Sequence, residues 1–144
     1  MITRSATAHY DGMGKAGKGW VSTQSGVLSE QPYGFNTRFE DAAGTNPEEL
    51  IAAAHAGCFT MALAFALAGK GINDGTLETT ARVTLEQDGP GFRVSRSDLD
   101  LRADVPGIGE DDLRRLAEEA KTNCPISKLL KADMDLKVTT AAVA

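Results

Sequence analysis

The sequence predicts an α+β protein. Strand-like alternation of polar and apolar residues fills the first 40 positions, a long apolar segment follows at residues 50–69, and an amphipathic helical pattern lies at residues 110–123. Strand and helix patterns come in separate runs and not in strict alternation, which is typical of the α+β class. The 144 residues suit one domain, residues 1–144, with a hydrophobic core of its own.

The N-terminal part predicts short strands separated by turn residues. Four segments have the alternating pattern: residues 2–10, 20–25, 27–30 and 35–40. A Gly-rich stretch at residues 11–19 predicts a turn, and Pro32 ends the third segment. The fourth segment, with the sequence FNTRFE, would place Arg38 near the middle of a strand.

A long helix is predicted to begin at Pro47. Asn46 is a good N-cap residue, Pro47 suits the first helical position, and acidic residues follow in the first turn, where the helix dipole favours them. Residues 50–69 are then almost wholly apolar, and many of them are Ala or Gly. Lys70, Gly71 and Asn73 end the helix.

A helix that is apolar on every side needs cover on every side. Its ~20 residues would be about 30 Å long, which one small sheet does not surround. A second subunit would supply the missing cover, so the sequence predicts a homodimer. A helix of this length could also cross a membrane, although it is rich in Ala and Gly and contains His55 and Thr60.

The C-terminal part predicts a hairpin, two helices and a last strand. Residues 76–88 and 92–103 read as strands around the turn Gly89-Pro90-Gly91, and Leu99 and Leu101 break the alternation of the second strand, which predicts a bulge. Residues 110–123 predict a helix with Leu113, Leu116, Ala117 and Ala120 facing inward. The remaining predicted elements are a turn at 106–109, a short helix at 126–131 and a strand at 133–143.

The overall charge excludes some partners. A net charge of −5 argues against binding to nucleic acid or to an anionic membrane surface. The N-terminus shows no apolar signal segment, so a cytoplasmic location is expected. Two cysteines in a cytoplasmic protein are not expected to form a permanent disulfide, and no cluster has zinc-like spacing.

Cys58 and Cys124 are the candidate reactive groups. Cys58 lies in the apolar helix, where burial alone would raise its pKa and make it an inert core residue. Cys124 lies at a helix break beside Pro125, where a following helix N-terminus would lower its pKa. A two-cysteine peroxidase needs one thiolate that attacks the peroxide, a second thiol that captures the sulfenic acid, and a cation that holds the first thiolate.

Arg38 and Glu48 are candidates for the cation and its carboxylate partner. Arg stays charged when buried, and a buried Arg needs a carboxylate beside it. Glu48 precedes Cys58 by ten residues, a rise of about 15 Å on one helix. One hypothesis is a dimer in which Arg38 and Glu48 of one subunit reach Cys58 of the other, and action within one subunit stays open. The alternatives are a solvated charge for Arg38 and simple helix-start electrostatics for Glu48.

Two motifs resemble the OsmC/Ohr family, which comprises osmotically inducible protein C and the organic hydroperoxide resistance proteins. The first is Asn46-Pro47-Glu48-Glu49-Leu50, followed by Ala53-Ala54-His55-Ala56-Gly57-Cys58-Phe59, and the second is Asn123-Cys124-Pro125-Ile126-Ser127. The resemblance covers essentially the whole chain. It is closer to the OsmC branch, since Arg38 comes after three strand-like segments and residues 53–57 lack the Tyr of the Ohr-like version.

The resemblance implies an intertwined homodimer of α+β subunits, with long buried central helices clad by antiparallel sheets and active sites at the subunit interface. It implies that Cys58 is the peroxidatic cysteine, Cys124 the resolving cysteine, Arg38 the activating arginine and Glu48 its partner. Organic hydroperoxides would be reduced to alcohols, and hydrogen peroxide more weakly. An external dithiol would restore the enzyme, with no metal, haem or flavin. His55 would be a packed core histidine, and Phe39, Phe59 and Met61 would be apolar walls.

Three alternatives stay open on the sequence. A stress-related binding protein would have this fold without turnover, and its cysteines would be replaceable. A thiol redox sensor would be oxidised stoichiometrically by the same cysteines. A membrane-associated protein would use the apolar helix as its anchor and would need detergent for purification.

Overall fold

The computed structural model describes residues 1–141 of the chain. These residues are α+β, with two three-stranded sheets and several helices. The chain divides into two compact units, Met1–Leu50 and the residues from Ile51 onward. The single domain expected from the sequence stays a prediction.

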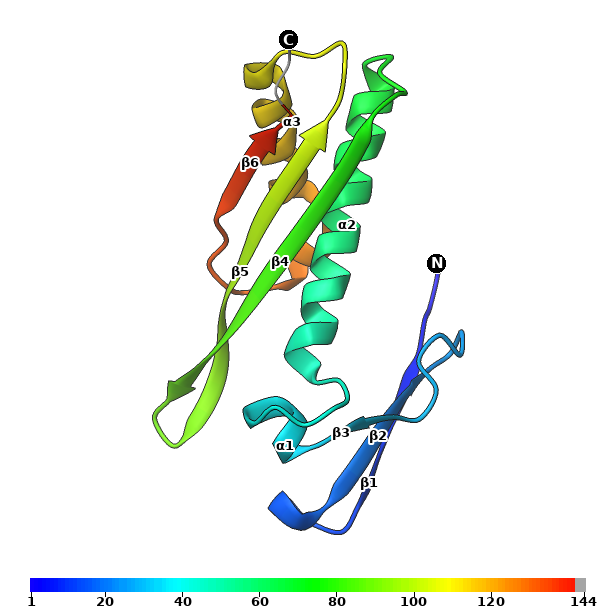
Figure 1. Ribbon diagram of the computed structural model, residues 1–144, viewed down its shortest axis with the longest axis vertical. Coiled ribbons are helices and arrows are strands. Elements are labelled where there is room, and N and C mark those ends of the chain that lie inside the picture. The colour runs from blue at the N-terminus through cyan, green and yellow to red at the C-terminus, as the bar shows by residue number, and fades with distance from the viewer. Residues whose placement is uncertain (142–144) are drawn as a thin grey trace. The chain divides into compact units, whose positions relative to one another are not determined.

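The first unit is a small antiparallel sheet followed by a short helix (Figure 1). Its strands pair in the order β1-β2-β3, with Trp20 of β2 opposite His9 of β1 and Pro32 of β3. The elements are β1 (Ala6–Asp11), the 3-10 helix η1 (Gly14–Ala16), β2 (Lys18–Thr23), β3 (Gln31–Tyr33) and α1 (Phe35–Phe39).

The strand predicted at residues 27–30 is wrong. This segment belongs to a turn that closes back on β2, because the backbone N–H of Thr23 donates to the carbonyl of Leu28, and Leu28 N–H donates to the Thr23 hydroxyl. The strand begins directly after the predicted segment, as β3 (Gln31–Tyr33), and includes Pro32. Proline is tolerated there because β3 is an edge strand.

The strand predicted at residues 35–40 is also wrong, because residues Phe35–Phe39 form the helix α1. The Thr37 hydroxyl accepts a hydrogen bond from the Gly34 N–H at 2.8 Å, which caps the turn locally. Phe35 and Phe39 lie one helical turn apart, with ring centroids 5.0 Å from each other. A five-residue segment is too short for alternation to distinguish a strand from one turn of helix.

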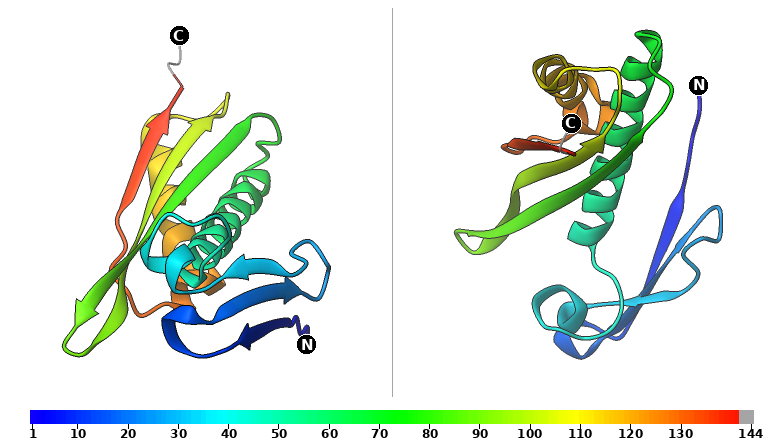
Figure 2. Two further views of the ribbon diagram at one scale, coloured as in Figure 1. Left: turned by 60° about the horizontal axis from the view of Figure 1, so that its bottom comes forward. Right: turned by 45° about the horizontal axis from the view of Figure 1, so that its top comes forward.

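The second unit is a sheet with helices on one face (Figures 1 and 2). Its strands pair in the order β4-β5-β6. The pair β4–β5 is antiparallel and the pair β5–β6 is parallel, so the expectation of purely antiparallel sheets is wrong for this sheet. The reason is that the chain crosses from β5 to β6 through two helices and not through a tight turn. The strands are β4 (Thr76–Asp88), β5 (Gly91–Asp104) and β6 (Leu136–Thr140), and the crossover helices are α3 (Glu110–Asn123) and α4 (Pro125–Leu129).

Several predicted elements are confirmed. The strand at 76–88 and the helix at 110–123 have the predicted bounds, and all four predicted inward residues of α3 are buried. The predicted bulge exists, but it lies at Ser95, where the register with β4 shifts between Thr84 and Leu85. The last strand is shorter than predicted, and residues 142–143 of that prediction lie outside the described residues.

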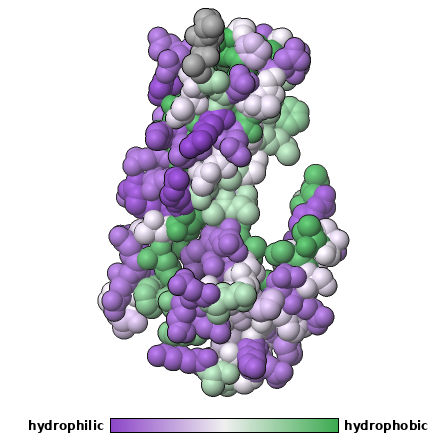
Figure 3. Space-filling model, viewed as in Figure 1, coloured by the Kyte–Doolittle hydropathy of each residue, from purple (hydrophilic) through white to green (hydrophobic). Residues whose placement is uncertain are grey.

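The helix α2 (Pro47–Gly69) has the predicted start and end. One face of it, with Phe59, Leu63 and Leu67, joins the core formed by β5, β6 and α3. The opposite face is exposed, and it includes Met61 at 62% and Phe65 at 72%. The helix is therefore not buried on all sides within one chain. Figure 3 shows pale green, hydrophobic surface over part of α2, next to the hydrophilic surface over the strands.

Within residues 1–141, α2 is the one helix whose length and composition would let it cross a membrane. A core helix of a soluble protein passes the same test, so this finding is weak evidence for a membrane span.

Candidate thiol site

The two cysteines lie together in the second unit. Cys58 comes from the middle of α2 and is half-buried, and Cys124 lies at the junction of α3 and α4 and is fully buried. Both are free thiols, and Cys58 packs against the buried core cluster that contains Cys124, close enough for each thiol to shift the other's pKa. The fold thus brings together two cysteines that are 66 positions apart in the sequence.

The surroundings shift the pKa values of the two thiols in opposite directions. Burial raises the pKa of Cys58, the hydrogen bond with Cys124 raises it further, and the backbone N–H of Ile126 only partly offsets these effects. Burial also raises the pKa of Cys124, but the neighbouring Cys58 thiol and the first residues of α4, Ile126 and Ser127, outweigh it, so its pKa falls. Burial works against a thiolate on Cys58, so Cys58 needs an additional cation to become the nucleophile.

A buried histidine lies beside the cysteine pair. His55 is 0% exposed, one turn before Cys58 on α2. Its Nδ1 is hydrogen-bonded to the Ser97 hydroxyl of β5 at 2.5 Å, and its Nε2 to the Ser127 hydroxyl of α4 at 2.7 Å. Burial lowers the pKa of His55, so its ring is neutral near pH 7. The expectation of a packed, hydrogen-bonded core histidine is confirmed.

Sequence reasoning missed Ser97 and Ser127 as members of this site. They lie 42 and 72 residues from His55, and no local pattern connects them. One signal was available, because Ser127 belongs to the motif that contains Cys124.

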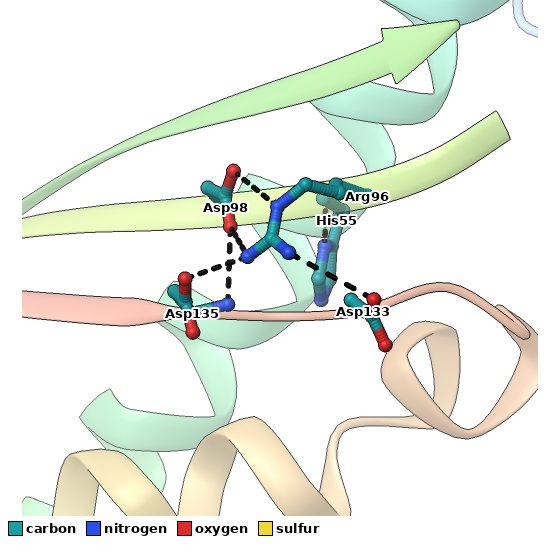
Figure 4. A network of polar contacts seen from close by, with 6 residues as sticks. His55, Arg96, Asp98, Asp133 and Asp135 are labelled. Atoms are coloured by element: carbon teal, nitrogen blue, oxygen red, sulfur yellow. Dashed lines mark hydrogen bonds and ion pairs between the residues drawn. The ribbon is translucent and has the colours of Figure 1, made fainter. Parts of the chain in front are cut away.

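An arginine holds the segment after α4 against β5. Arg96 forms ion pairs with Asp98 at 2.9 Å, with Asp135 at 2.6 Å and with Asp133 at 3.8 Å. Figure 4 shows the Arg96 guanidinium between these three carboxylates, with His55 close to the same stretch of β5. Since successive residues of a strand face opposite sides, Arg96 lies on the outer face while Ser97 points inward. The cluster thus fixes the strand from which Ser97 reaches His55.

Arg38 and Glu48 form a two-point ion pair in the first unit. Nε of Arg38 donates to Oε1 of Glu48 at 2.7 Å, and its NH2 group donates to Oε2 at 3.0 Å. Glu48 is 11% exposed and Arg38 36% exposed in their side chains. The ion pair expected between these residues is present, whereas their role toward Cys58 stays a prediction. A two-point pair fixes the direction of the guanidinium as well as its position.

The loop between α1 and α2 positions this ion pair. The Asn46 side chain accepts from the backbone N–H of Glu49 at 2.8 Å, as expected of the N-cap, and donates to the carbonyl of Thr37 at 3.2 Å. Asn46 therefore ties the start of α2 directly to the helix that carries Arg38. Gly44 has φ +139°, and a Cβ there would collide with the carbonyl of Pro32, so this loop requires glycine.

The four predicted site residues therefore form two pairs, one in each unit. The structure brings Arg38 to Glu48 and Cys58 to Cys124. Of the three predicted apolar walls, Phe59 is buried in the core, whereas Met61 and Phe39 are exposed. The Phe39 ring lies 5.5 Å from the Arg38 guanidinium carbon, so it stays a candidate for contact with substrate.

Comparison with known proteins agrees with this fold. A family model described as OsmC-like protein matches residues 40–139. The chain is 48% identical to the Peroxiredoxin OsmC of Escherichia coli over 135 residues, which is 94% of each chain. It is 34% identical to the organic hydroperoxide resistance protein of Xanthomonas axonopodis over 68% of each chain. The crystal structure of the organic hydroperoxide resistance protein OhrB of Bacillus subtilis matches with a TM-score of 0.69, 27% identity and coverage of 97% and 98%.

The chain is an α+β protein with two neighbouring free thiols, one on a long apolar helix and one at a helix junction. The chain belongs to the OsmC-like family.

Proposed function

We propose that this protein is a thiol-dependent peroxidase that reduces organic hydroperoxides to alcohols, and hydrogen peroxide more weakly. The observation that carries the proposal is that the free thiols of Cys58 and Cys124 lie in one buried cluster. The similarity to Peroxiredoxin OsmC and to organic hydroperoxide resistance proteins supports the same activity.

In the first step the Cys58 thiolate attacks the distal peroxide oxygen. A sulfur–oxygen bond forms, the oxygen–oxygen bond breaks, and the alkoxide leaves and takes up a proton to become the alcohol. Arg38 holds the Cys58 thiolate and stabilises the charge that develops on the leaving oxygen. The raised pKa of Cys58 is the reason why a cation is needed. Glu48 is the positioning residue that fixes the direction of the guanidinium.

In the second step Cys124 attacks the sulfur of the Cys58 sulfenic acid. A disulfide forms, the sulfur–oxygen bond breaks, and hydroxide leaves as water after protonation. An external dithiol then reduces the disulfide and is itself oxidised to a disulfide, which returns both cysteines to thiols. This cycle uses side chains and the external dithiol, and it requires no metal, haem or flavin.

We further propose that the working form is an intertwined homodimer in which both units of the chain act as one domain. The exposed face of α2 is apolar and continuous, with Ala53, Gly57, Met61, Ala64, Phe65 and Ala68 along it. A second copy of α2 would cover this face, and its small residues would allow close packing. Ten helical residues, a rise of about 15 Å, separate Glu48 from Cys58. Since Arg38 is paired with Glu48, the Arg38 of one subunit would contact Cys58 of the other subunit. We expect this dimer in the cytoplasm.

The test is peroxide turnover by the purified protein. Cumene hydroperoxide and hydrogen peroxide are compared, with a dithiol as the donor. We expect faster turnover with the organic peroxide, none in Cys58→Ser, and a single stoichiometric step in Cys124→Ser, which stops at the sulfenic acid.

Other outcomes are informative. A single step in Cys58→Ser and none in Cys124→Ser would reverse the roles of the two cysteines. Stoichiometric oxidation of the wild-type protein without turnover would favour a redox sensor. No reaction in a folded, fully reduced protein would favour a binding protein.

A further inference from the structure

The two sulfurs differ in their access to solvent. Cys124 is 0% exposed and belongs to the hydrophobic core, together with residues of β5 and α3 such as Leu99 and Leu116. Cys58 packs against the same core, but part of its side chain stays exposed. Within residues 1–141, a small molecule in solution therefore reaches the sulfur of Cys58 and not that of Cys124.

The helix that follows Cys124 is held in this position at its start. Ser127, in the first turn of α4, is hydrogen-bonded to Nε2 of His55 on α2 at 2.7 Å. Nδ1 of the same ring is hydrogen-bonded to the Ser97 hydroxyl at 2.5 Å, so one imidazole joins α4, α2 and β5. All three side chains are buried, so water does not compete for these contacts.

The segment after α4 is held as well. Arg96 forms ion pairs with Asp133 and Asp135, as Figure 4 shows. The backbone of this segment also pairs with β5, since Ser97 N–H donates to the carbonyl of Asp133 at 2.9 Å and Leu99 N–H to that of Asp135 at 2.8 Å. The helix α4 thus has an anchor at each end, and at least one anchor must break before the junction of α3 and α4 can reach the surface.

The geometry of thiol–disulfide exchange makes this difference in access decisive. A thiolate attacks one sulfur of a disulfide from the side opposite to the other sulfur, which is the leaving group, and access decides which sulfur is attacked. Attack on Cys124 would need the incoming thiolate to lie behind that sulfur, inside the core. Attack on Cys58 needs only the line along which hydroxide left when Cys124 displaced it from the Cys58 sulfenic acid.

We propose that the external dithiol attacks the sulfur of Cys58, so that Cys58 carries the mixed disulfide with the donor and Cys124 is the leaving group. This inference rests on the proposed function, since it assumes that a disulfide between Cys58 and Cys124 forms during the cycle. Peroxide and reductant then use the same opening in turn, and Cys124 stays in the core throughout.

The exchange proceeds in two balanced steps. A donor thiolate forms a bond to the Cys58 sulfur, the bond between Cys58 and Cys124 breaks, and Cys124 leaves with the electron pair and takes up a proton. The second thiolate of the donor attacks the donor's own sulfur in the mixed disulfide, and Cys58 leaves as a thiolate. One protein disulfide and one dithiol thus become two reduced cysteines and one donor disulfide. Cys58 is released in the form that attacks the next peroxide.

The experiment identifies the attacked sulfur in the full-length protein. The disulfide is formed with diamide, so no peroxide is needed, and an excess of the monothiol 2-mercaptoethanol is added. The reaction is stopped at early times with acid and denaturant, and the freed cysteine is alkylated with N-ethylmaleimide while the solution is still acidic. Digestion without reductant and mass spectrometry then locate both groups. We expect mercaptoethanol on Cys58 and maleimide on Cys124, in an excess on the order of tenfold over the reverse.

The same reaction in urea is the control for access. Unfolding exposes both sulfurs, so the adduct is expected on the two cysteines in nearly equal amounts. Adducts mainly on Cys124, or equally on both cysteines, in the folded protein would overturn the inference. A preference for Cys58 that is just as large in urea would also overturn it, because the preference would then not come from the fold.

Two variants test the anchor at the start of α4. Ser127→Ala removes the hydrogen bond to His55, so α4 opens more often and the share of adduct on Cys124 is expected to rise about 2- to 10-fold. Ser95→Ala is the matched control, since Ser95 is 7% exposed on the same strand as Ser97 and its hydroxyl has no hydrogen-bond partner among the described residues. An unchanged share in Ser127→Ala, or an equal rise in Ser95→Ala, would contradict the role given to the anchor.

Failure of the proposed function gives a different result. Wild-type protein that consumes no peroxide, but carries the mercaptoethanol adduct on Cys58 after treatment with diamide, would refute the peroxidase activity and support the inference. A protein whose two cysteines diamide does not link would overturn the inference itself.

Discussion

Replacing Glu48 by Gln tests whether the direction of the Arg38 guanidinium matters for the peroxide step. The two hydrogen bonds of this pair, 2.7 and 3.0 Å long, are both charge-assisted. Gln keeps one acceptor and presents an N–H₂ group where the second oxygen was, so one bond is lost. A hydrogen bond to a charged group contributes about 1.5–3 kcal/mol. If all of it supports the transition state, the rate falls by about 10- to 150-fold.

Solvent screens the ion pair, which makes the expected fall in rate smaller. Arg38 is 36% exposed, so the lower part of the range applies, and we expect the oxidation of Cys58 by cumene hydroperoxide to slow about 10- to 30-fold. The assay is rapid-quench alkylation of the remaining Cys58 thiol after mixing with excess peroxide.

Glu49→Gln is the matched control for this prediction. Glu49 neighbours Glu48 on α2, but its carboxylate accepts from the Thr45 hydroxyl at 2.8 Å and forms no ion pair with Arg38. We expect it to keep the wild-type rate. A wild-type rate in Glu48→Gln, or an equal loss in Glu49→Gln, would refute the role given to the ion pair.

Three further predictions concern assembly and stability. Phe65→Lys, on the exposed face of α2, should convert the dimer to monomer in analytical ultracentrifugation, whereas Val27→Lys, at an equally exposed apolar residue of a turn, should not. Leu101→Ala in the core should lower the free energy of unfolding by about 2–5 kcal/mol in urea, whereas Leu129→Ala, 71% exposed, should change it by less than about 0.5 kcal/mol. The hydrogen bond from Arg96 lowers the pKa of Asp98, so this carboxylate stabilises the fold above its unfolded pKa and the effect disappears as pH falls through the lower folded pKa. Asp98→Asn should therefore destabilise the protein at neutral pH, and the difference from wild type should shrink below pH ~4 in denaturant titrations.

The parts of the fold that the sequence predicts well have strong local signals. The start of α2 combines an N-cap, a proline and acidic residues, and Asn46 makes the capping contact that this pattern predicts. The strand at 76–88 and the helix at 110–123 each repeat one period over more than ten residues. By contrast, α1 is five residues long, and its helical form depends on the contact between Thr37 and Gly34. No periodicity reveals a contact of that kind.

The candidate site also contains some residues that the sequence predicts and others that it does not. Cys58, Cys124 and Glu48 are found from the sequence because they stand in recognisable motifs, and the resemblance adds Arg38. Ser97 lies on a strand whose alternation is shifted by the bulge at Ser95, so the side of the sheet that it faces is not evident from its neighbours. The importance of His55 follows only from its two distant serines, which are tertiary contacts.

The most direct test of the central claim is peptide mass spectrometry after a single turnover. Fully reduced protein is treated with one equivalent of cumene hydroperoxide, alkylated, digested without reductant and analysed for linked peptides. The proposed cycle predicts one alcohol per chain and a disulfide that joins the peptide of Cys58 to that of Cys124. Consumption of peroxide that leaves both cysteines alkylated, or oxidation that never links them, would contradict it.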